Sequence, residues 1–168
     1  MSVSALVVLV PEADPIVGSW RLRYDRPGIP AHVTVMYPFL PGIPAADLAE
    51  LFAAHPPFTA TFSRLGRLPG LLYLDPAPSA SFRALTSAVT GRWPQAQPYG
   101  GRYGDPVPHL TVAQDQPAET FDVIEADLER RLPFEMSVSE VTLVRFADGA
   151  WHVAEVFGLG PGPSPKAS

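Results

Sequence analysis

The chain has 168 residues, of which 46% are hydrophobic and 17% charged, a balance typical of one folded domain with a sizeable core. It contains no cysteine, which excludes disulfides, thiolate nucleophiles and cysteine-ligated zinc and is consistent with a cytoplasmic location. The net charge of −5 argues against long nucleic acid held on a basic surface, whereas a local pocket can still suit a small phosphorylated ligand or an RNA end.

The first half of the chain alternates predicted strands and helices. The apolar run at 5–10 is far too short to cross a bilayer and lacks a basic leader, so we interpret it as a buried first strand and expect no membrane association. In chain order, the pattern predicts a strand at 3–10, a helix within 11–24, a strand at 31–40 that stops at its prolines, an amphipathic helix at 44–55, and a hairpin of strands 58–65 and 71–74.

The second half repeats much of this order. It predicts a helix at 79–93, a loop at 94–108, a strand at 109–113, a helix at 118–132, one long or two short strands within 134–146, and a last strand at 151–159 after an Asp148-Gly149 turn. We therefore expect a single domain over 1–160, with halves at about 1–70 and 71–160, and a flexible tail at 161–168. The repeat indicates a duplicated α+β unit with a pseudo-two-fold axis and a central cleft.

Both halves carry the triplet His-x-Thr on a short β-branched run. Successive side chains of a strand point to opposite faces, so His32 shares a face with Thr34, and His109 shares one with Thr111. By the same alternation, Tyr37 is expected on the other face, in the core. Random placement of four His and eight Thr predicts only about 0.2 such triplets.

These residue types suit chemistry at phosphorus. If the two motifs face one cleft, one neutral imidazole can act as a base and one protonated imidazole as an acid, while the two hydroxyls bind non-bridging phosphate oxygens. The four histidines do not have the spacing of zinc ligands, and the sequence contains no HExxH pattern, so neither a metal nor a cofactor is expected.

The segments HVTV (32–35) and HLTV (109–112), with the contexts HVTVMYPF and PHLTVA and the closing WHVAEVFGLG, resemble the 2H phosphoesterase superfamily, which includes 2′-5′ RNA ligase and cyclic phosphodiesterase members. The resemblance implies a bilobal α+β fold with a cleft between the lobes and no metal. It implies His32 and His109 as the acid–base pair, in an order left open, and Thr34 and Thr111 as phosphate ligands. The implied substrates carry an RNA-type 2′,3′-cyclic phosphate, a 2′-5′ linkage or an ADP-ribose-type cyclic phosphate.

We therefore expect two antiparallel β-sheets with flanking helices around a central cleft, in a monomer that acts on a small nucleotide or an RNA end. The expected activity is metal-independent phosphodiester hydrolysis, with 2′-5′ RNA ligation as the reverse reaction. One alternative is a non-catalytic module that binds a nucleotide or an RNA end. The other is a structural duplicated domain in which both histidines are buried.

The Gly-rich loop at 94–108 precedes the second motif. It is either a flexible connection or a substrate-covering loop in which Tyr99 or Tyr103 stacks on a base and Arg102 pairs with a phosphate. The single lysine lies in the tail, so any cation near the cleft must be an arginine. The candidates are Arg23, Arg26, Arg64, Arg67, Arg102 and Arg145.

Overall fold

The computed structural model describes residues 3–25, 28–101 and 107–160. Its strands and helices follow the predicted order, and the segment 134–146, predicted as one long or two short strands, contains two strands. The elements are β1 (Val3–Leu9), α1 (Asp14–Tyr24), β2 (His32–Phe39), α2 (Ala45–Ala53), β3 (Phe58–Leu68), β4 (Leu71–Ala77), α3 (Ser79–Arg92), β5 (Leu110–Gln114), α4 (Ala118–Glu129), β6 (Phe134–Val138), β7 (Glu140–Ala147) and β8 (Ala150–Gly158), with short 3-10 turns η1 (Pro11–Ala13) and η2 (Pro98–Gly101).

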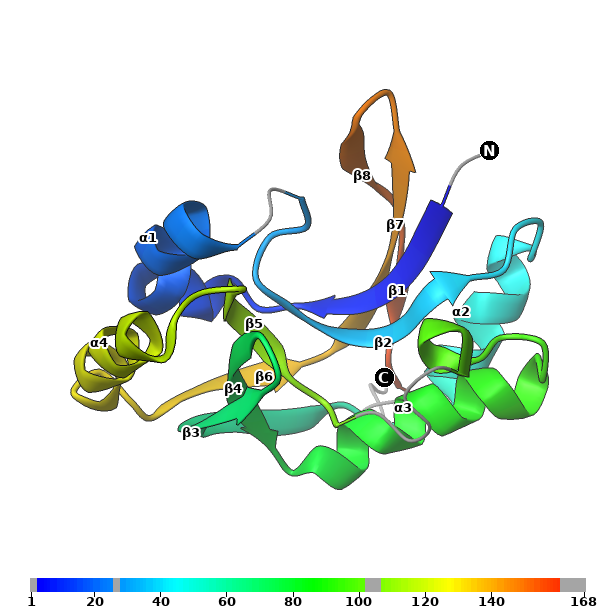
Figure 1. Cartoon of the computed structure of the whole chain (residues 1–168). Coiled ribbons are helices and arrows are strands. Elements are labelled where there is room, and N and C mark those ends of the chain that lie inside the picture. Colours follow the sequence, from blue (N-terminus) through cyan, green and yellow to red (C-terminus); the bar gives the residue numbers. More distant parts are fainter. Residues whose placement is uncertain (1–2, 26–27, 102–106, 161–168) are drawn as a thin grey trace.

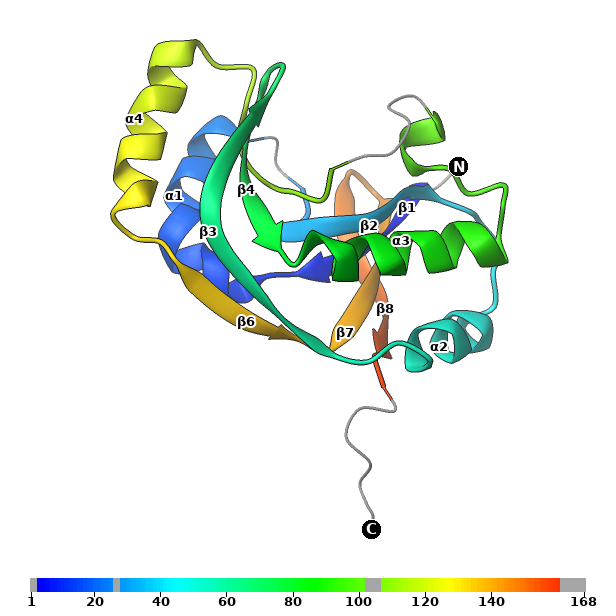
Figure 2. The same ribbon diagram turned by 90° about the horizontal axis from the view of Figure 1, so that it is seen from below.

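All eight strands belong to one antiparallel sheet in the order β6-β3-β4-β5-β2-β1-β7-β8. The α+β class is confirmed, but the prediction of two separate sheets is wrong. The two motif strands lie side by side at the centre, and the pair Val33–Leu110 joins β2 to β5. Because this junction is so short, four strands on each side can curl away from it while the ladder stays continuous (Figures 1 and 2).

Two hairpin turns have the local chemistry that the sequence predicts. Gly70, with φ of +72°, lies between β3 and β4. Asp148 and Gly149, with φ of 54° and 78°, lie between β7 and β8, and two consecutive positive φ values are typical of the two-residue turn that matches strand twist. The β7–β8 hairpin projects from the rest of the sheet (Figure 1).

The helices form two pairs, α1 with α4 and α2 with α3, at opposite ends of the curled sheet (Figure 2). The indole of Trp20 on α1 donates to Asp127 on α4 at 2.8 Å, and the hydroxyl of Thr86 on α3 donates to the carbonyl of Val35 on β2 at 2.8 Å. One sheet face and the apolar sides of the helices form the main core. The other face of β2 and β5 carries the polar motif residues.

Among the described residues, no helix has both the length and the apolar character that a membrane crossing requires. The domain limit at residue 160 and the division near residue 70 stay predictions.

Candidate functional site

The two His-x-Thr motifs lie on adjacent strands at the centre of the sheet. Val33 and Leu110 are fully buried and form the cross-strand pair between β2 and β5. In an antiparallel pair the neighbours of these two residues face each other on the opposite side of the sheet, so each histidine stands across from the threonine of the other motif. The four motif side chains are half-buried on that face: His32, Thr34, His109 and Thr111.

Each imidazole is held by the same local device. Nδ1 of His32 is 2.8 Å from the carbonyl oxygen of Pro30, and Nδ1 of His109 is 2.7 Å from the carbonyl oxygen of Val107. A carbonyl can only accept a hydrogen bond, so in both rings Nδ1 carries the hydrogen and donates. Nε2 is then left to exchange a proton with a ligand in both motifs.

The surroundings of the imidazoles favour their neutral form. Burial is the main cause that lowers the pKa of His32 from 6.5 to about 4, and the positive charges of Arg21 and of His109 lower it further. The carbonyl of Pro30 and the charge of Asp25 act in the opposite direction. Burial also lowers the pKa of His109. The cross-strand pairing of the two motifs places the rings close enough for the charge of one to act on the pKa of the other.

Tyr73 on β4 packs against His109. Their ring centroids are 5.6 Å apart and the planes meet at 63°, an edge-to-face contact. Tyr73 also lies across Gly66 on β3, where a Cβ atom would overlap the phenol ring. Gly66 therefore leaves the space that Tyr73 needs in order to support the imidazole.

Arg21 on α1 is one of the site residues that sequence reasoning missed. Its Nε donates to the carbonyl of Thr111 at 3.1 Å, and its Nη2 donates to the carbonyl of Ile29 at 3.1 Å and to Oδ2 of Asp25 at 2.8 Å. The side chains of Arg21 and Asp25 are only 13% and 6% exposed. Gln114 on β5 donates to the other oxygen of Asp25 at 2.7 Å.

This network connects the loop before the first motif with the strand of the second. The i,i+4 spacing of Arg21 and Asp25 is visible in the sequence, but such a pair is ordinary on an exposed helix face. Only the packing of α1 against β5 shows that the pair is buried and placed between the two motifs.

A small pocket adjoins the motif residues. It is lined by Thr34 and His109 from the motifs, by Tyr37, by Arg83 on α3 and by Tyr99 in η2, among others. The prediction that Tyr37 lies in the core is therefore wrong. The β1–β2 register shifts between the pairs Leu6–Met36 and Val7–Thr34, and this irregularity reverses the alternation of β2 and leaves Tyr37 37% exposed on the motif face.

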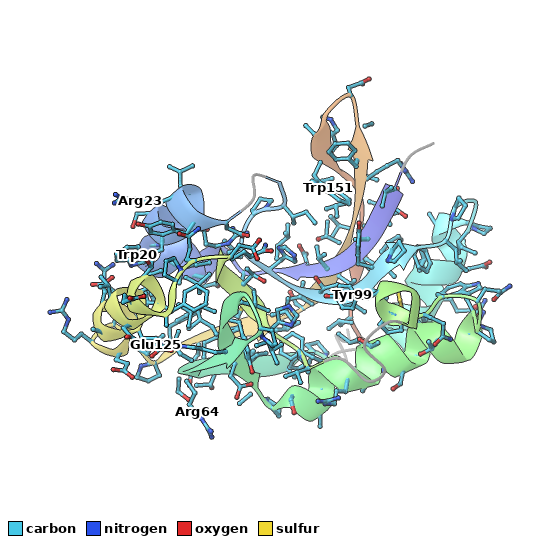
Figure 3. All side chains as sticks on the ribbon, in the orientation of Figure 1. Trp20, Arg23, Arg64, Tyr99, Glu125 and Trp151 are labelled. Atoms are coloured by element: carbon cyan, nitrogen blue, oxygen red, sulfur yellow. The ribbon has the colours of Figure 1, made fainter. Side chains whose placement is uncertain are left out.

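The other predicted site residues have mixed outcomes. The ring of Tyr99 lies 6.1 Å from that of Tyr37, at the edge of the pocket, whereas Arg102 and Tyr103 lie outside the described residues, as does Arg26. Arg67 pairs with two carboxylates of α4, so it is not directed at the motifs. Figure 3 shows Arg23 and Arg64 pointing away from the centre of the sheet. Instead, the pocket and its surroundings contain two arginines that were not singled out, Arg21 and Arg83.

Among the described residues, no three His, Asp or Glu side chains come together in a way that could hold a metal ion.

Comparison with known proteins gives a family and a fold. The model of the 2′-5′ RNA ligase superfamily matches residues 9–150. No curated protein sequence matches the chain.

Three solved structures resemble the chain over almost its whole length. They are Escherichia coli LigT complexed with NADP⁺ (TM-score 0.58, 19% identity, 95% of this chain and 98% of that one), the same protein complexed with 3′-AMP (0.56, 20%, 95% and 98%), and TT0787 of Thermus thermophilus (0.59, 20%, 96% and 100%). At these identities the likeness establishes the fold alone.

Proposed function

Because the chain belongs to the 2′-5′ RNA ligase superfamily and its two His-x-Thr motifs meet on one sheet face, we propose that it is a metal-independent phosphodiesterase. The substrate we propose is a 2′,3′-cyclic phosphate or a related phosphodiester of a nucleotide or an RNA end. The observation that carries the proposal is that two imidazoles with equivalent hydrogen bonds and two hydroxyls lie on the same face of two adjacent strands.

The proposed reaction is an in-line displacement at phosphorus. One imidazole takes a proton from water as its oxygen forms a bond to phosphorus, and the other gives a proton to the ribose oxygen as its bond to phosphorus breaks. Thr34 and Thr111 donate hydrogen bonds to the non-bridging oxygens. Each proton transfer contributes about 10²- to 10⁴-fold to the rate. With the 5′-hydroxyl of a second RNA in place of water, the same groups join two RNA ends: one imidazole takes the proton of that hydroxyl as its oxygen bonds to phosphorus, and the other protonates the departing 3′-oxygen, which leaves a 2′-5′ linkage.

The strand geometry suits this division of labour. Each histidine stands across from the other motif's threonine, so a phosphate placed between β2 and β5 has an imidazole on either side. That LigT has been crystallised with 3′-AMP supports a nucleotide-type ligand for this fold. We also propose that the protein acts as a cytoplasmic monomer on small substrates and not on long nucleic acid, in keeping with its net charge of −5.

The test is hydrolysis of a 2′,3′-cyclic nucleotide in the presence of EDTA. The wild type should turn it over, and His32→Ala and His109→Ala should each lose about 10²- to 10⁴-fold in kcat. His152→Ala is the matched control, because His152 is exposed on β8 and outside the motifs. Absence of turnover by the wild type, or full activity in either motif variant, would refute the proposal.

One observation favours the alternative of a binding module. Burial lowers the pKa of both imidazoles, so the ligand-free site is poor in the protonated acid that catalysis requires at neutral pH. A bound phosphate offsets this by attracting a proton to the site. If a phosphorylated nucleotide slows amide hydrogen exchange at Thr34 and Thr111 but is never consumed between pH 5 and pH 8, the protein is better described as a binding module.

A further inference from the structure

Apolar side chains remain exposed on one side of the motif residues. In the described part of the chain, nine large hydrophobic side chains are exposed. Three of these, Val3, Phe146 and Val153, lie on the same sheet face as the first motif, as the pairs Val3–Phe146, Val7–Thr34 and Val144–Val153 show. A fourth, Tyr37, lines the pocket beside the motifs. A gathering of exposed apolar groups beside a polar site is typical of a ligand-binding surface.

The aromatic rings on this face form a continuous row that starts at the motif pocket. We call Tyr37, Trp151 and Phe146 the aromatic shelf. The centroid of Tyr37 lies 6.1 Å from that of Tyr99 and 6.4 Å from that of Trp151, and Trp151 lies 5.5 Å from Phe146. Figure 3 shows Tyr99 beside β2 and Trp151 on the projecting β7–β8 hairpin. The shelf therefore leads outward from the proposed phosphate position.

Two structural devices hold the shelf in place. The irregularity between β1 and β2 turns Tyr37 onto the motif face, as bulges beside active sites often do. The indole of Trp151 packs against Gly28, where a Cβ would lie 3.1 Å from it, and contacts the apolar cluster that contains Ile29. The next residue, Pro30, accepts the hydrogen bond of His32, so the shelf adjoins the segment that orients the first imidazole.

The orientation of the rings indicates what can bind. The planes of neighbouring shelf rings meet at 62° and 66°, so the rings do not form one flat surface on which bases could stack as in a duplex. Bases bound along it are therefore splayed apart, as in single-stranded RNA held on aromatic side chains. Arg145, the nearest basic residue along β7, pairs with Ser4 and so belongs to the opposite sheet face. Binding along the shelf is by stacking more than by charge, which suits a chain with a net charge of −5.

We propose that the aromatic shelf is a subsite for the nucleosides next to the reacting phosphate, so that the preferred substrate is a single-stranded oligoribonucleotide end of two or more nucleotides. This inference rests on the proposed function and narrows its substrate class, a nucleotide or an RNA end, to a short RNA end.

The first test compares substrates of different length. Wild-type protein is given a 2′,3′-cyclic mononucleotide and oligoribonucleotides of two and four nucleotides that end in the same cyclic phosphate. Stacking of one base on an aromatic side chain is expected to raise kcat/KM about 10- to 100-fold for the dinucleotide over the mononucleotide.

The variants show whether the shelf causes this preference. Trp151→Ala and the more exposed Phe146→Ala should each reduce the ratio of the two kcat/KM values, and Trp151→Phe should retain part of it. Leu22→Ala, at a 90% exposed position on α1, is the matched control and should keep the wild-type ratio. Equal kcat/KM at all lengths in the wild type, or an unchanged ratio in both alanine variants, overturns the proposal.

The second test does not depend on turnover. An oligoribonucleotide with a 3′-terminal phosphate should quench tryptophan emission more than the corresponding mononucleotide does, and Trp151→Phe should abolish the difference while Trp20 and Trp93 remain. If the wild type consumes no cyclic phosphate but shows this quench, the proposed function fails and the shelf stands as an RNA subsite. If turnover occurs but the quench does not depend on length, only the shelf proposal fails. Sedimentation of the wild type and of Phe146→Ala tests whether the shelf binds a second copy of the protein instead. If the wild type is a dimer that Phe146→Ala dissociates, and the preference for longer RNA does not change, the shelf is a protein interface and the proposal is overturned.

Discussion

Replacing His32 should change how the stability of the protein depends on pH. Its pKa is about 4 in the folded protein and 6.5 in a solvated chain. Between these values the unfolded chain binds a proton that the folded protein does not. The contribution of His32 to the unfolding free energy is therefore most favourable above pH 6.5 and is lost as the pH falls towards 4. Gln is the suitable replacement, since it is polar, similar in reach and does not titrate.

The magnitude follows from the two pKa values. One unit of difference corresponds to about 1.36 kcal/mol, and between pH 7 and pH 4 the linkage amounts to about 3 kcal/mol for this one group. A loss of that size is a large fraction of the stability of a typical domain. The wild type should therefore lose about 3 kcal/mol more of its unfolding free energy over this interval than His32→Gln does.

The assay is urea unfolding of both proteins at pH 7, 5.5 and 4, without phosphate in the buffer. His152→Gln, at an exposed position on β8, should follow the wild type at every pH. If His32→Gln loses as much stability on acidification as the wild type, the imidazole is not kept neutral by its surroundings, and the electrostatic description of the site is wrong.

Three further outcomes test the site. Because the pKa of each motif histidine is lowered, kcat/KM should rise as the pH falls from 7.5 towards 5; a maximum above pH 7 would contradict this. Gly66→Ala should displace the phenol ring of Tyr73 from His109, which should lower kcat and cost about 1 to 3 kcal/mol of unfolding free energy. Adding Tyr73→Leu to this variant should restore most of the stability. If Gly66→Ala leaves the melting temperature and kcat unchanged, the contact between Tyr73 and His109 does not support the imidazole. Arg21→Met should raise the pKa of His32 and so move the acidic limb of the pH–rate profile to higher pH. Arg21→Lys should leave that limb in place but lower kcat, since a lysine keeps the charge and loses the forked hydrogen bonds. Identical profiles for the two variants would show that the charge of Arg21 does not act on the imidazole.

Much of this protein is determined by local sequence. The alternation of β2 and β5 sends Val33 and Leu110 to the core and the motif side chains to the other face, because the period of a strand is two. The Asp148-Gly149 pair specifies its hairpin because both residues tolerate positive φ. These signals act within a few residues, so they can be read without knowing what the segments pack against.

The tertiary structure decided the features that depend on which strands become neighbours. The joining of all strands into one sheet follows from the Val33–Leu110 pair, which no local pattern specifies. The register change opposite Leu6 depends on the partner strand and places Tyr37 on the site face against the expected alternation. Arg21 is an ordinary helix cation until α1 packs on β5 and removes it from water. Periodicity encodes which side of a strand is buried, whereas long-range pairing and desolvation arise only when distant segments meet.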